Sequence, residues 1–551
     1  MFHRTAYPRI VGGDVILMTL CALCLSSTTT MANSYQMPQP RDHVLFYSEH
    51  ELDVWIVGPD KTRMAIGDMP SAEPIRIPKG IQWGVTPRRN TTLSEILEVV
   101  REHGVPGLRL ARSGLSTEDI RQLRTTPGLS ILDLSHSPLP RGAVLDLHWL
   151  GHVERLYLSL TQLTDDDMLL LGAISFTGLK HLDVSMNDVS NRGVRALGGH
   201  TMLRSLDMSF TAVDDGAMST VAQWPKLEVL NLGYTQITDN GMLLLGRNGS
   251  AELADLNLES TEITDEGIEH LAEFEALRRV NLKDTDITEQ AGPHFEDMTE
   301  LEMLDLRNTK VGDETLRALA GLEHLEKLRL AGTHVTDEGV SALKETGSLR
   351  HLDLTGTRVT SAAIEAIESL RGLETLVLAG TDVSDTGMVE IGRLQRLRVL
   401  SMRNTAVKGD GLSHISQLKS LQSLDLSGTD TAKSDFEDIV ALRSLRELNL
   451  RGVSIGDSEL EHIGKLRNLQ FLDLSGADIS DKGVEYLSGL PVLEVLSLDD
   501  TDVGDEGLHA LTENDRLERL YLRGTNVTEE SAGRFYEQMP DCRVILIEEG
   551  F

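Results

Sequence analysis

The stretch LEKLRLAGTHVTDEGVSALKETGS, residues Leu325–Ser348, contains the pattern that decides the fold. Leu328 and Leu330 alternate with polar residues, as expected for a short strand that buries one face. Val335 and Val340 follow at spacings that predict a turn and then a helix of about two turns. The Thr-Asp pair between these two valines offers an N-cap for that helix. One strand and one short helix therefore form the predicted unit.

This unit recurs through most of the chain at an interval of 24 residues. Copies of LxxLxL begin at Leu129, Leu179, Leu203, Leu227, Leu253, Leu277, Leu301, Leu325, Leu349, Leu373, Leu397, Leu421, Leu445, Leu469, Leu493 and Leu517. Degenerate copies begin at Val105, Val153 and Cys542, and the interval is 26 residues after Val153 and after Leu227. Such sustained self-similarity predicts a solenoid in which each repeat packs on its neighbours.

The connection between successive strands fixes the type of sheet. Strands that are joined through a helix must be parallel. The sequence therefore predicts an α/β solenoid, a horseshoe with a concave parallel sheet of about 19 strands and short convex helices. A threonine row after the strands, interrupted at Val453 and Ala477, predicts a hydrogen-bonded ladder of turns. Its members are Thr161, Thr211, Thr235, Thr261, Thr285, Thr309, Thr333, Thr357, Thr381, Thr405, Thr429, Thr501 and Thr525.

The repeat also carries a family resemblance. LEVLSLDDTDVGDEGLHAL at Leu493–Leu511 and LRHLDLTGTRVTSAAIEAI at Leu349–Ile367 match the pattern LxxLxLxxTxVTDxGLxxLxxL closely. This pattern resembles bacterial-type leucine-rich repeat proteins, in which Thr replaces the usual Asn. The resemblance covers residues 105–551 and implies recognition of a protein or peptide on the concave face. A similar repeat occurs in substrate receptors of ubiquitin ligases, but residues 38–87 do not resemble the three-helix adaptor module of those receptors.

Composition narrows the classes of partner. The chain has 52 Lys+Arg against 86 Asp+Glu, a formal net charge of −34. Such a charge repels phosphate backbones and anionic lipid surfaces, which disfavours binding to nucleic acid or to a membrane surface. The sequence contains no nucleotide-binding glycine loop, HExxH motif or GxSxG elbow. We therefore expect no enzymatic activity, no catalytic residue, no cofactor and no bound metal.

Residues before the repeats divide into two segments. Arg4 and Arg9 precede the apolar run Val15–Leu25 and small or polar residues that end at Ala32, which predicts a signal peptide over 1–32. An uncleaved anchor and a misassigned start are the alternatives. Proline-rich residues 33–90 predict short strands that form a cap on the solenoid. A small separate binding module is the alternative for this second segment.

The remaining boundaries follow from the repeat. Trp55 and Trp83 are the expected core residues of the cap. An amphipathic helix begins at Thr91 and leads into the repeats, so we assign 91–551 to the solenoid and 525–551 to its terminal repeat. Within it, Phe535–Ile547 resembles the closing repeat of the leucine-rich repeat family.

The candidate partner-binding residues are Tyr157, Leu160, Met186, Phe210 and Tyr234. The last four occupy one position, the last variable position of the strand segment, in successive repeats. Glycine takes this position farther along, at Gly332, Gly356, Gly380, Gly428, Gly452 and Gly476. An apolar stripe at steps of about 5 Å, in a chain with 4% aromatic residues, predicts a hydrophobic binding centre. The alternative is that these side chains fold over the strand edge and cover the core.

Two aspartate rows and one histidine pair have structural interpretations. The central strand row is Asp133, Asp183, Asp207, Asn231, Asn257, Asn281, Asp305, Asp353, Asp425, Asn449 and Asp473; we interpret it as ordinary for the repeat, with a basic peptide or cation as the alternative ligand. The helix-start row is Asp165, Asp215, Asp239, Asp265, Asp313, Asp337, Asp385, Asp457, Asp481 and Asp505, which predicts helix capping rather than calcium binding. His148 and His152 have i,i+4 spacing, a weak zinc signal that we interpret as surface histidines.

These observations predict an exported, secreted, periplasmic or cell-surface recognition scaffold that binds a protein or peptide. We expect no membrane insertion after the signal peptide is cleaved, and the sequence does not predict an oligomeric state. An intracellular adaptor of the ubiquitin-ligase receptor type is the first alternative. An enzyme with its site in residues 33–90 is the second.

Overall fold

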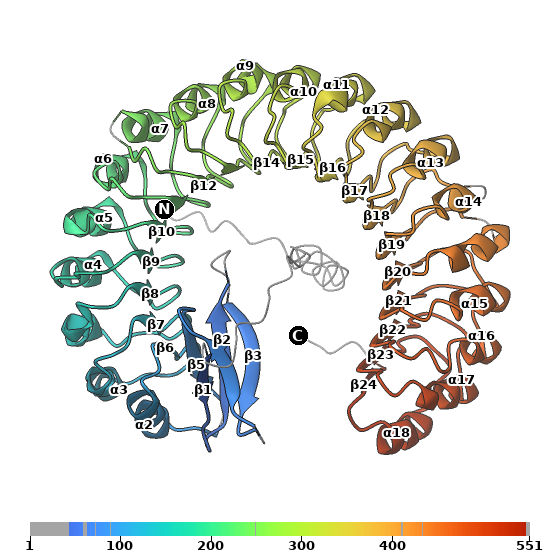
Figure 1. Cartoon of the computed structure of the whole chain (residues 1–551), viewed down its shortest axis with the longest axis horizontal. Helices are drawn as coiled ribbons and strands as arrows, with labels where there is room; N and C mark the ends of the chain where they lie inside the picture. The colour runs from blue at the N-terminus through green and yellow to red at the C-terminus, as the bar shows by residue number, and fades with distance from the viewer. Residues whose placement is uncertain are drawn as a thin grey trace, which may run out of the picture. The chain divides into compact units, whose positions relative to one another are not determined.

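The computed structural model describes residues 43–58, 63–71, 73–88, 90–247, 249–408, 411–431 and 433–546. It divides the chain into two compact units, Met1–Gly107 and Leu108–Phe551 (Figure 1). The predicted signal peptide, 1–32, lies outside the described residues. Of the helices described, none is both long and apolar enough to cross a membrane.

The described part of the first unit consists of short antiparallel strands and one helix. Its elements are β1 (His43–Phe46), β2 (Leu52–Val57), β3 (Arg63–Met69), β4 (Ile75–Pro78), β5 (Trp83–Pro87) and α2 (Leu93–His103). β1 pairs with β4, and β2 pairs with both β3 and β5. β3 was not expected from the sequence, because most of its side chains are at least partly exposed and give no apolar alternation.

Trp55 and Trp83 are both buried in this first unit, as predicted. The ring of Phe46 lies 5.3 Å from that of Trp83 and 5.5 Å from that of His103, measured between ring centroids. These contacts hold α2 and the strands in one core. The first unit extends to Gly107 and includes α2, the amphipathic helix that the sequence predicts as the start of the solenoid segment 91–551.

The second unit is a solenoid with one parallel strand in each repeat, and its inner side is the sheet (Figure 1). β6 (Gly107–Arg109) contains the division between the units. The strands that follow are β7 (Ile131–Asp133), β8 (Arg155–Tyr157), β9 (His181–Asp183), β10 (Ser205–Asp207), β11 (Val229–Asn231), β12 (Asp255–Asn257), β13 (Arg279–Asn281), β14 (Met303–Asp305), β15 (Lys327–Arg329), β16 (His351–Asp353), β17 (Thr375–Val377), β18 (Val399–Ser401), β19 (Ser423–Asp425), β20 (Glu447–Asn449), β21 (Phe471–Asp473), β22 (Val495–Ser497), β23 (Arg519–Tyr521) and β24 (Arg543–Ile545).

Helices form the outer side of the solenoid (Figure 1). They are α3 (Thr117–Gln122), α4 (Asp165–Gly172), α5 (Asn191–Ala196), α6 (Met218–Val221), α7 (Asp239–Gly246), α8 (Asp265–Leu271), α9 (Gly292–Phe295), α10 (Asp313–Leu319), α11 (Asp337–Ala342), α12 (Ile364–Glu368), α13 (Asp385–Ile391), α14 (Gly411–Ile415), α15 (Asp457–Ile463), α16 (Asp481–Glu485), α17 (Asp505–Ala510) and α18 (Glu529–Gln538). Short 3₁₀ turns extend or replace helices at Leu123–Thr125, Ala143–Leu150, Leu197–Gly199, Asp215–Ala217, Glu289–Ala291, Leu343–Glu345, Ser361–Ala363, Lys433–Ala441 and Leu511–Glu513.

Leucine stacking explains why the register is kept. Leu206 of β10 is level with Leu230 of β11, and the same register holds between each strand from β7 to β24 and the next. In the repeat Leu325–Ser348, the side chains of Leu325, Leu328 and Leu330 are fully buried. Burial of each such side chain contributes about 1.5–3 kcal/mol, and a shift of register would expose all of them.

The threonine row forms the predicted ladder. Thr333 Oγ1 donates a hydrogen bond of 2.6 Å to the carbonyl oxygen of Leu330, three residues earlier. The other members of the row make the same bond at 2.5–2.7 Å. At Val453 and Ala477 only the backbone N–H reaches the corresponding carbonyl. The structural interpretation of the threonines is therefore confirmed.

The helix-start aspartates act between repeats, which differs from the predicted capping of their own helices. Asp313 Oδ1 accepts the backbone N–H of Thr336 at 2.8 Å, and its Oδ2 accepts the Thr336 hydroxyl at 2.7 Å. Thr336 is itself the N-cap of α11. Equivalent pairs are Asp165–Ser190, Asp215–Thr238, Asp239–Thr264, Asp265–Thr288, Asp337–Thr360, Asp457–Ser480 and Asp505–Thr528. Each carboxylate thus fastens the helix start of the next repeat.

The central strand row closes turns. The Oδ1 atom of Asp183 accepts the N–H of Ser185 at 3.0 Å, two residues later. Every other Asp or Asn of the row accepts the N–H of the residue two positions later in the same way, at 2.9–3.2 Å. Side-chain oxygens in such turns satisfy backbone donors that the short strand leaves unpaired. The row is therefore a structural feature of the repeat.

Candidate functional site: an apolar row in a left-handed turn

The four apolar residues of the candidate site lie in turns rather than in strands. β10 ends at Asp207, and Phe210 follows it in the turn that leads to the next helix. Leu160, Met186 and Tyr234 occupy the same place after β8, β9 and β11. This corrects the assignment of the row to the strand segment, because each strand is only three residues long. We call these four residues the apolar row; it borders the concave sheet where the strands end.

Each member of the apolar row has a left-handed backbone. Its φ angles are 54° at Leu160, 54° at Met186, 55° at Phe210 and 58° at Tyr234. The backbone N–H of each residue donates to a carbonyl of the next repeat, as in Phe210 N–H to Gly233 O at 2.9 Å. The stacked turns therefore impose this conformation. At the equivalent positions farther along, the residues are Ser260, Asp284, Asn308, Gly332, Gly356, Gly380, Asn404, Gly428, Gly452, Gly476, Asp500 and Gly524.

A large apolar side chain is costly at such a position. The left-handed conformation costs an L-residue about 1–2 kcal/mol, and only Gly, with Asn and Asp to a lesser degree, adopts it readily. The other repeats mostly use those residue types. Arg112, His136 and Ser260 depart from those types as well. Large apolar residues in four consecutive repeats therefore reduce stability unless their side chains recover the cost through contacts.

The side chains recover only part of that cost within the chain. The rings of Phe210 and Tyr234 stack, with centroids 4.1 Å apart and an interplanar angle of 11°. All four side chains of the apolar row nevertheless remain 42–45% exposed. A little more than half of each residue is therefore covered by its surroundings, and the rest faces solvent. The row presents an apolar surface built on a fixed backbone.

Charged and polar groups border the apolar row at its C-terminal end. The Tyr234 hydroxyl donates to Glu259 Oε1 at 3.0 Å, and Lys283 Nζ lies 2.8 Å from the same oxygen. Burial of the Lys283 ammonium lowers its pKa, but hydrogen bonds and charge interactions with Glu259 and Asp284 outweigh burial and raise it overall. The Glu259 carboxylate therefore fixes the phenol of Tyr234 and, with it, the aromatic stack.

Tyr157, the fifth candidate residue, lies apart from the turn row. It is in β8, half-buried, with Asp133 of β7 and Asp183 of β9 as its neighbours across the sheet. Burial of the Asp183 carboxyl, together with the charges of Asp207 and Asp133, raises its pKa to about 6. Two of the four strands that precede the apolar row, β9 and β10, thus end in neighbouring aspartates, Asp183 and Asp207.

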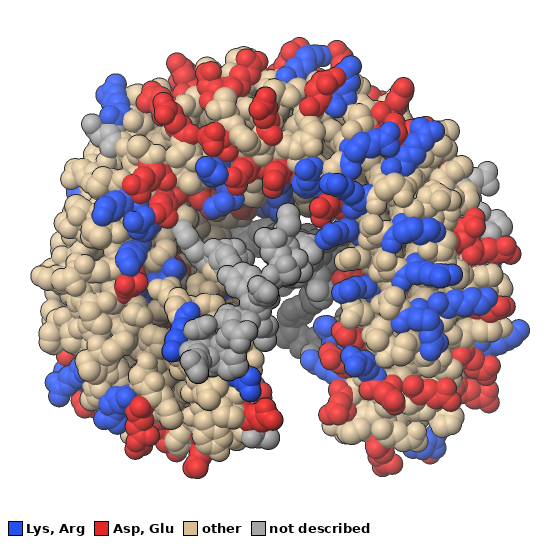
Figure 2. Space-filling view, viewed as in Figure 1, with Lys and Arg blue, Asp and Glu red and all other residues tan. Residues whose placement is uncertain are grey.

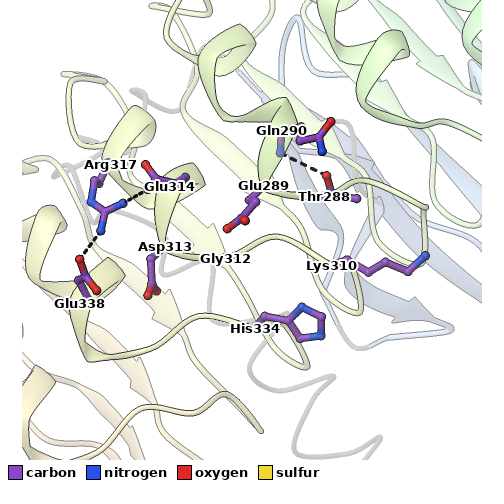
Figure 3. A pocket seen from close by; sticks show the side chains of 10 residues that line it. All are labelled: Thr288, Glu289, Gln290, Lys310, Gly312, Asp313, Glu314, Arg317, His334 and Glu338. Atoms are coloured by element: carbon purple, nitrogen blue, oxygen red, sulfur yellow. Dashed lines mark hydrogen bonds and ion pairs between the residues drawn. The ribbon is translucent and has the colours of Figure 1, made fainter.

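A polar cavity of about 540 Å³ lies in the strand-to-helix turns farther along the solenoid (Figure 3). Its lining includes Glu289 and Gly312. These two residues replace the aspartate and the threonine that pair between other neighbouring repeats. Arg317 at one end pairs with Glu314 and Glu338. Its lining side chains are polar or charged and come from the turns and helix starts of neighbouring repeats (Figure 3).

The two histidines of the i,i+4 pair contact different groups. His148 Nδ1 lies 2.9 Å from the carbonyl oxygen of Leu145, and the ring of His152 lies 6.5 Å from that of Trp149. Within the part of the chain that the structure describes, no group of three or more His, Cys, Asp or Glu residues could hold a metal ion.

The sequence predicted the residues of the apolar row but not their left-handed backbone conformation. The signal was present, because glycine recurs at the same position in later repeats and glycine marks a positive φ angle. No sequence pattern indicated that Glu259 and Lys283 border the apolar row, because their contacts join residues of neighbouring repeats.

Comparison with known proteins gives two matches to family models. A model described as a leucine-rich repeat region matches residues 257–515, and another, described as a leucine-rich repeat, matches residues 178–198 and 225–246. No curated protein matches the sequence at a significant level.

Solved structures with a similar chain path include two bacterial proteins. An internalin from Listeria monocytogenes is 21% identical over 61% of this chain and 90% of its own, with a TM-score of 0.48. A leucine-rich repeat protein from Leptospira interrogans is 21% identical over 82% of this chain and 98% of its own, with a TM-score of 0.46.

Proposed function

Because this chain belongs to the leucine-rich repeat proteins, we propose that it is a non-enzymatic scaffold that recognises a protein or peptide. Proteins of this class are typically binding scaffolds, and their partners differ from member to member. The proposed binding centre is the apolar row, Leu160, Met186, Phe210 and Tyr234, with Tyr157 on the adjacent strand. The partner covers the row and the neighbouring concave surface.

The left-handed backbone of the apolar row is the observation that carries this proposal. Glycine would relieve the strain at each of the four positions, yet the row holds bulky side chains that stay 42–45% exposed. Strain retained without a gain in folding stability is typical of functional sites. Aromatic residues at the centre of an apolar patch are also the residues that contribute most to binding a protein partner.

Glycine substitution gives a sharp test. In the variant with Phe210→Gly and Tyr234→Gly, the backbone keeps the conformation that glycine favours, while the binding side chains are removed. We expect the free energy of unfolding to be unchanged or higher, and capture of the native partner to fall at least about tenfold, as for loss of two central contact residues. Capture from the native source, quantified by mass spectrometry against wild type, measures the second effect.

The matched control makes the same change at the equivalent turn position of two other repeats. Asn404→Gly combined with Asp500→Gly replaces two other left-handed residues, well away from the apolar row. This control should capture the partner as wild type does. Capture that survives the loss of Phe210 and Tyr234 would exclude the apolar row as the binding centre.

We further propose that the protein is exported and acts as a secreted, periplasmic or cell-surface protein. Residues 1–32 support this proposal through Arg4, Arg9 and the apolar run Val15–Leu25. N-terminal sequencing of protein from its native source should give a chain that begins at Asn33. An intact Met1 would argue instead for the intracellular adaptor.

A further inference from the structure

Exposed cationic side chains collect at one edge of the solenoid in five consecutive repeats. They lie in the loops that lead from a helix into the next strand, within two residues of the leucine that begins LxxLxL. We call this set the basic edge, and its members are Arg371, Arg396, Lys419, Arg443 and Arg467, all exposed. Figure 2 shows Lys and Arg gathered over the part of the arc between β17 and β22, whereas the part that carries α4–α6 shows few charges.

The fold does not require cations at this position. Four of the five cations precede the leucine that begins LxxLxL by two residues, whereas Arg396 precedes it by one. In earlier repeats the residue that precedes the leucine, or the valine in its place, by two is Pro127, Gly151, Thr177, Thr201, Pro225, Ala251, Glu275, Thr299, Glu323 and Gly347. A cation near a helix C-terminus can interact with the free carbonyls there. Lys419 does so, with Nζ 2.7 Å from the carbonyl oxygen of Ser416, but no such bond is found for Arg396, Arg443 or Arg467 among the described residues.

Most of the basic edge also lacks carboxylate partners. Arg371 pairs with Glu368 at 2.5 Å. Among the residues that the structure describes, no carboxylate lies within ion-pair distance of Arg396, Arg443 or Arg467. Acidic residues outnumber basic ones in this chain and give it a net charge of −34. The basic edge, with Arg396, Arg443 and Arg467 unpaired, is therefore a locally positive surface on a chain whose net charge is negative.

We propose that the basic edge binds an acidic segment of a partner protein, which lies extended along the five repeats. Successive repeats are about 4.8 Å apart at the sheet and farther apart toward the helices. Side chains on one face of an extended peptide recur every ~6.6 Å, so acidic side chains can follow the row of cations. Each partner carboxylate then meets about one cation.

Screening by salt explains how the basic edge can attract an anionic segment although the protein as a whole is acidic. The Debye length is about 8 Å at physiological ionic strength, so a narrow segment on the edge interacts mainly with the cations beneath it. A duplex nucleic acid carries one charge per ~1.7 Å and extends beyond the edge, where the acidic surface repels it. The charge distribution therefore favours an acidic peptide over a nucleic acid.

Binding of a defined probe to the full chain tests the basic edge. The probe is a fluorescein-labelled oligoglutamate of about ten residues, long enough at about 3.3 Å per residue to cross the five repeats. Fluorescence anisotropy should show binding that weakens as salt increases. Arg443→Glu with Arg467→Glu should weaken binding about tenfold, because two attractions are lost and two repulsions are created. Arg443→Gln with Arg467→Gln should have a smaller effect.

The control variant carries the same change in net charge at another surface. Arg141→Glu with Arg358→Glu reverses two exposed arginines outside the basic edge, and its affinity should stay within about twofold of wild type. Wild-type protein that fails to bind the probe, or equal losses in both double variants, would overturn the proposal. So would equally tight binding of a DNA duplex with the same number of charges. The apolar row lies at the opposite ends of the strands, so failure of one site leaves the other unaffected.

Discussion

At the scale of single residues, the backbone angle at one turn position distinguishes the apolar row from the rest of the repeat. Gly332 and Phe210 occupy the same position with φ angles of 71° and 55°. The hydrogen bonds of the stacked turns hold both residues in this conformation, so the side chain is the only variable. A site of this kind can change its specificity through side chains alone, because the backbone is set by neighbouring repeats.

Asp183 gives a prediction for pH dependence at this scale. Its carboxyl has a pKa of about 6 in the folded chain, raised by burial and by Asp207 and Asp133, against about 3.9 in an unfolded chain. The folded state therefore binds the proton more tightly, and ionisation of Asp183 destabilises it as pH rises from about 4 to about 6. Asp183→Asn should raise the free energy of unfolding at pH 7 by about 1–3 kcal/mol, and by little at pH 4. Urea denaturation at a series of pH values measures the difference.

Asp353→Asn is the matched control for this prediction. Asp353 makes the same turn contacts, accepting the N–H of Thr355 at 3.0 Å and its hydroxyl at 2.6 Å. Its neighbours across the sheet are Arg329 and Val377 rather than a second carboxylate. The control should not gain stability between pH 4 and pH 7. A gain equal to that of Asp183→Asn would assign the effect to the turn instead of to neighbouring charges.

At the scale of the element, each strand–turn–helix unit is completed by its neighbours. The threonine hydroxyl closes the turn within a repeat, and the aspartate fastens the helix start of the next repeat. These bonds replace the long hydrogen-bonded ladders that three-residue strands and helices of about two turns do not provide. The repeats interrupted at Val453 and Ala477 lack the first of these bonds.

Two reciprocal substitutions test the contribution of the threonine bond. Thr333→Val removes the hydroxyl that donates to Leu330 O and should lower the free energy of unfolding by about 1 kcal/mol, the usual net value of one such bond. Val453→Thr should raise the free energy of unfolding by a similar amount. The backbone N–H of Val453 already lies 3.0 Å from the Leu450 carbonyl oxygen, so a threonine hydroxyl at this position can reach the same oxygen. Hydrogen exchange of the local amides reports each effect. Destabilisation by Val453→Thr would show that this turn cannot orient a hydroxyl as the other repeats do.

At the scale of the whole molecule, the repeat distributes distinct surfaces along one scaffold. The apolar row lies after β8 to β11, whereas the basic edge lies before β17 to β21. Each repeat packs on the next, so the surface residues of a repeat can vary without altering the core. The net charge of −34 means that an anionic partner of the proposed kind is repelled by most of the chain and attracted at the basic edge.

The sequence alone predicted the solenoid, the parallel sheet and the family, and two family models confirm the family. Local periodicity is sufficient for these features, because apolar residues at the positions of Leu325, Leu328 and Leu330, mostly leucines, recur from repeat to repeat and have one way to be buried together. Sequence also located the four residues of the apolar row, since they depart from the glycine pattern.

Only the tertiary structure decided how those residues are presented. The left-handed turn at Phe210 depends on the Gly233 carbonyl of the next repeat, and the Asp313 carboxylate finds its partner at Thr336 rather than in its own helix. These contacts join residues separated by a full repeat, so no local pattern states them. Stacking of whole repeats sets the backbone and the exposure of the site, while the sequence sets which side chains stand there.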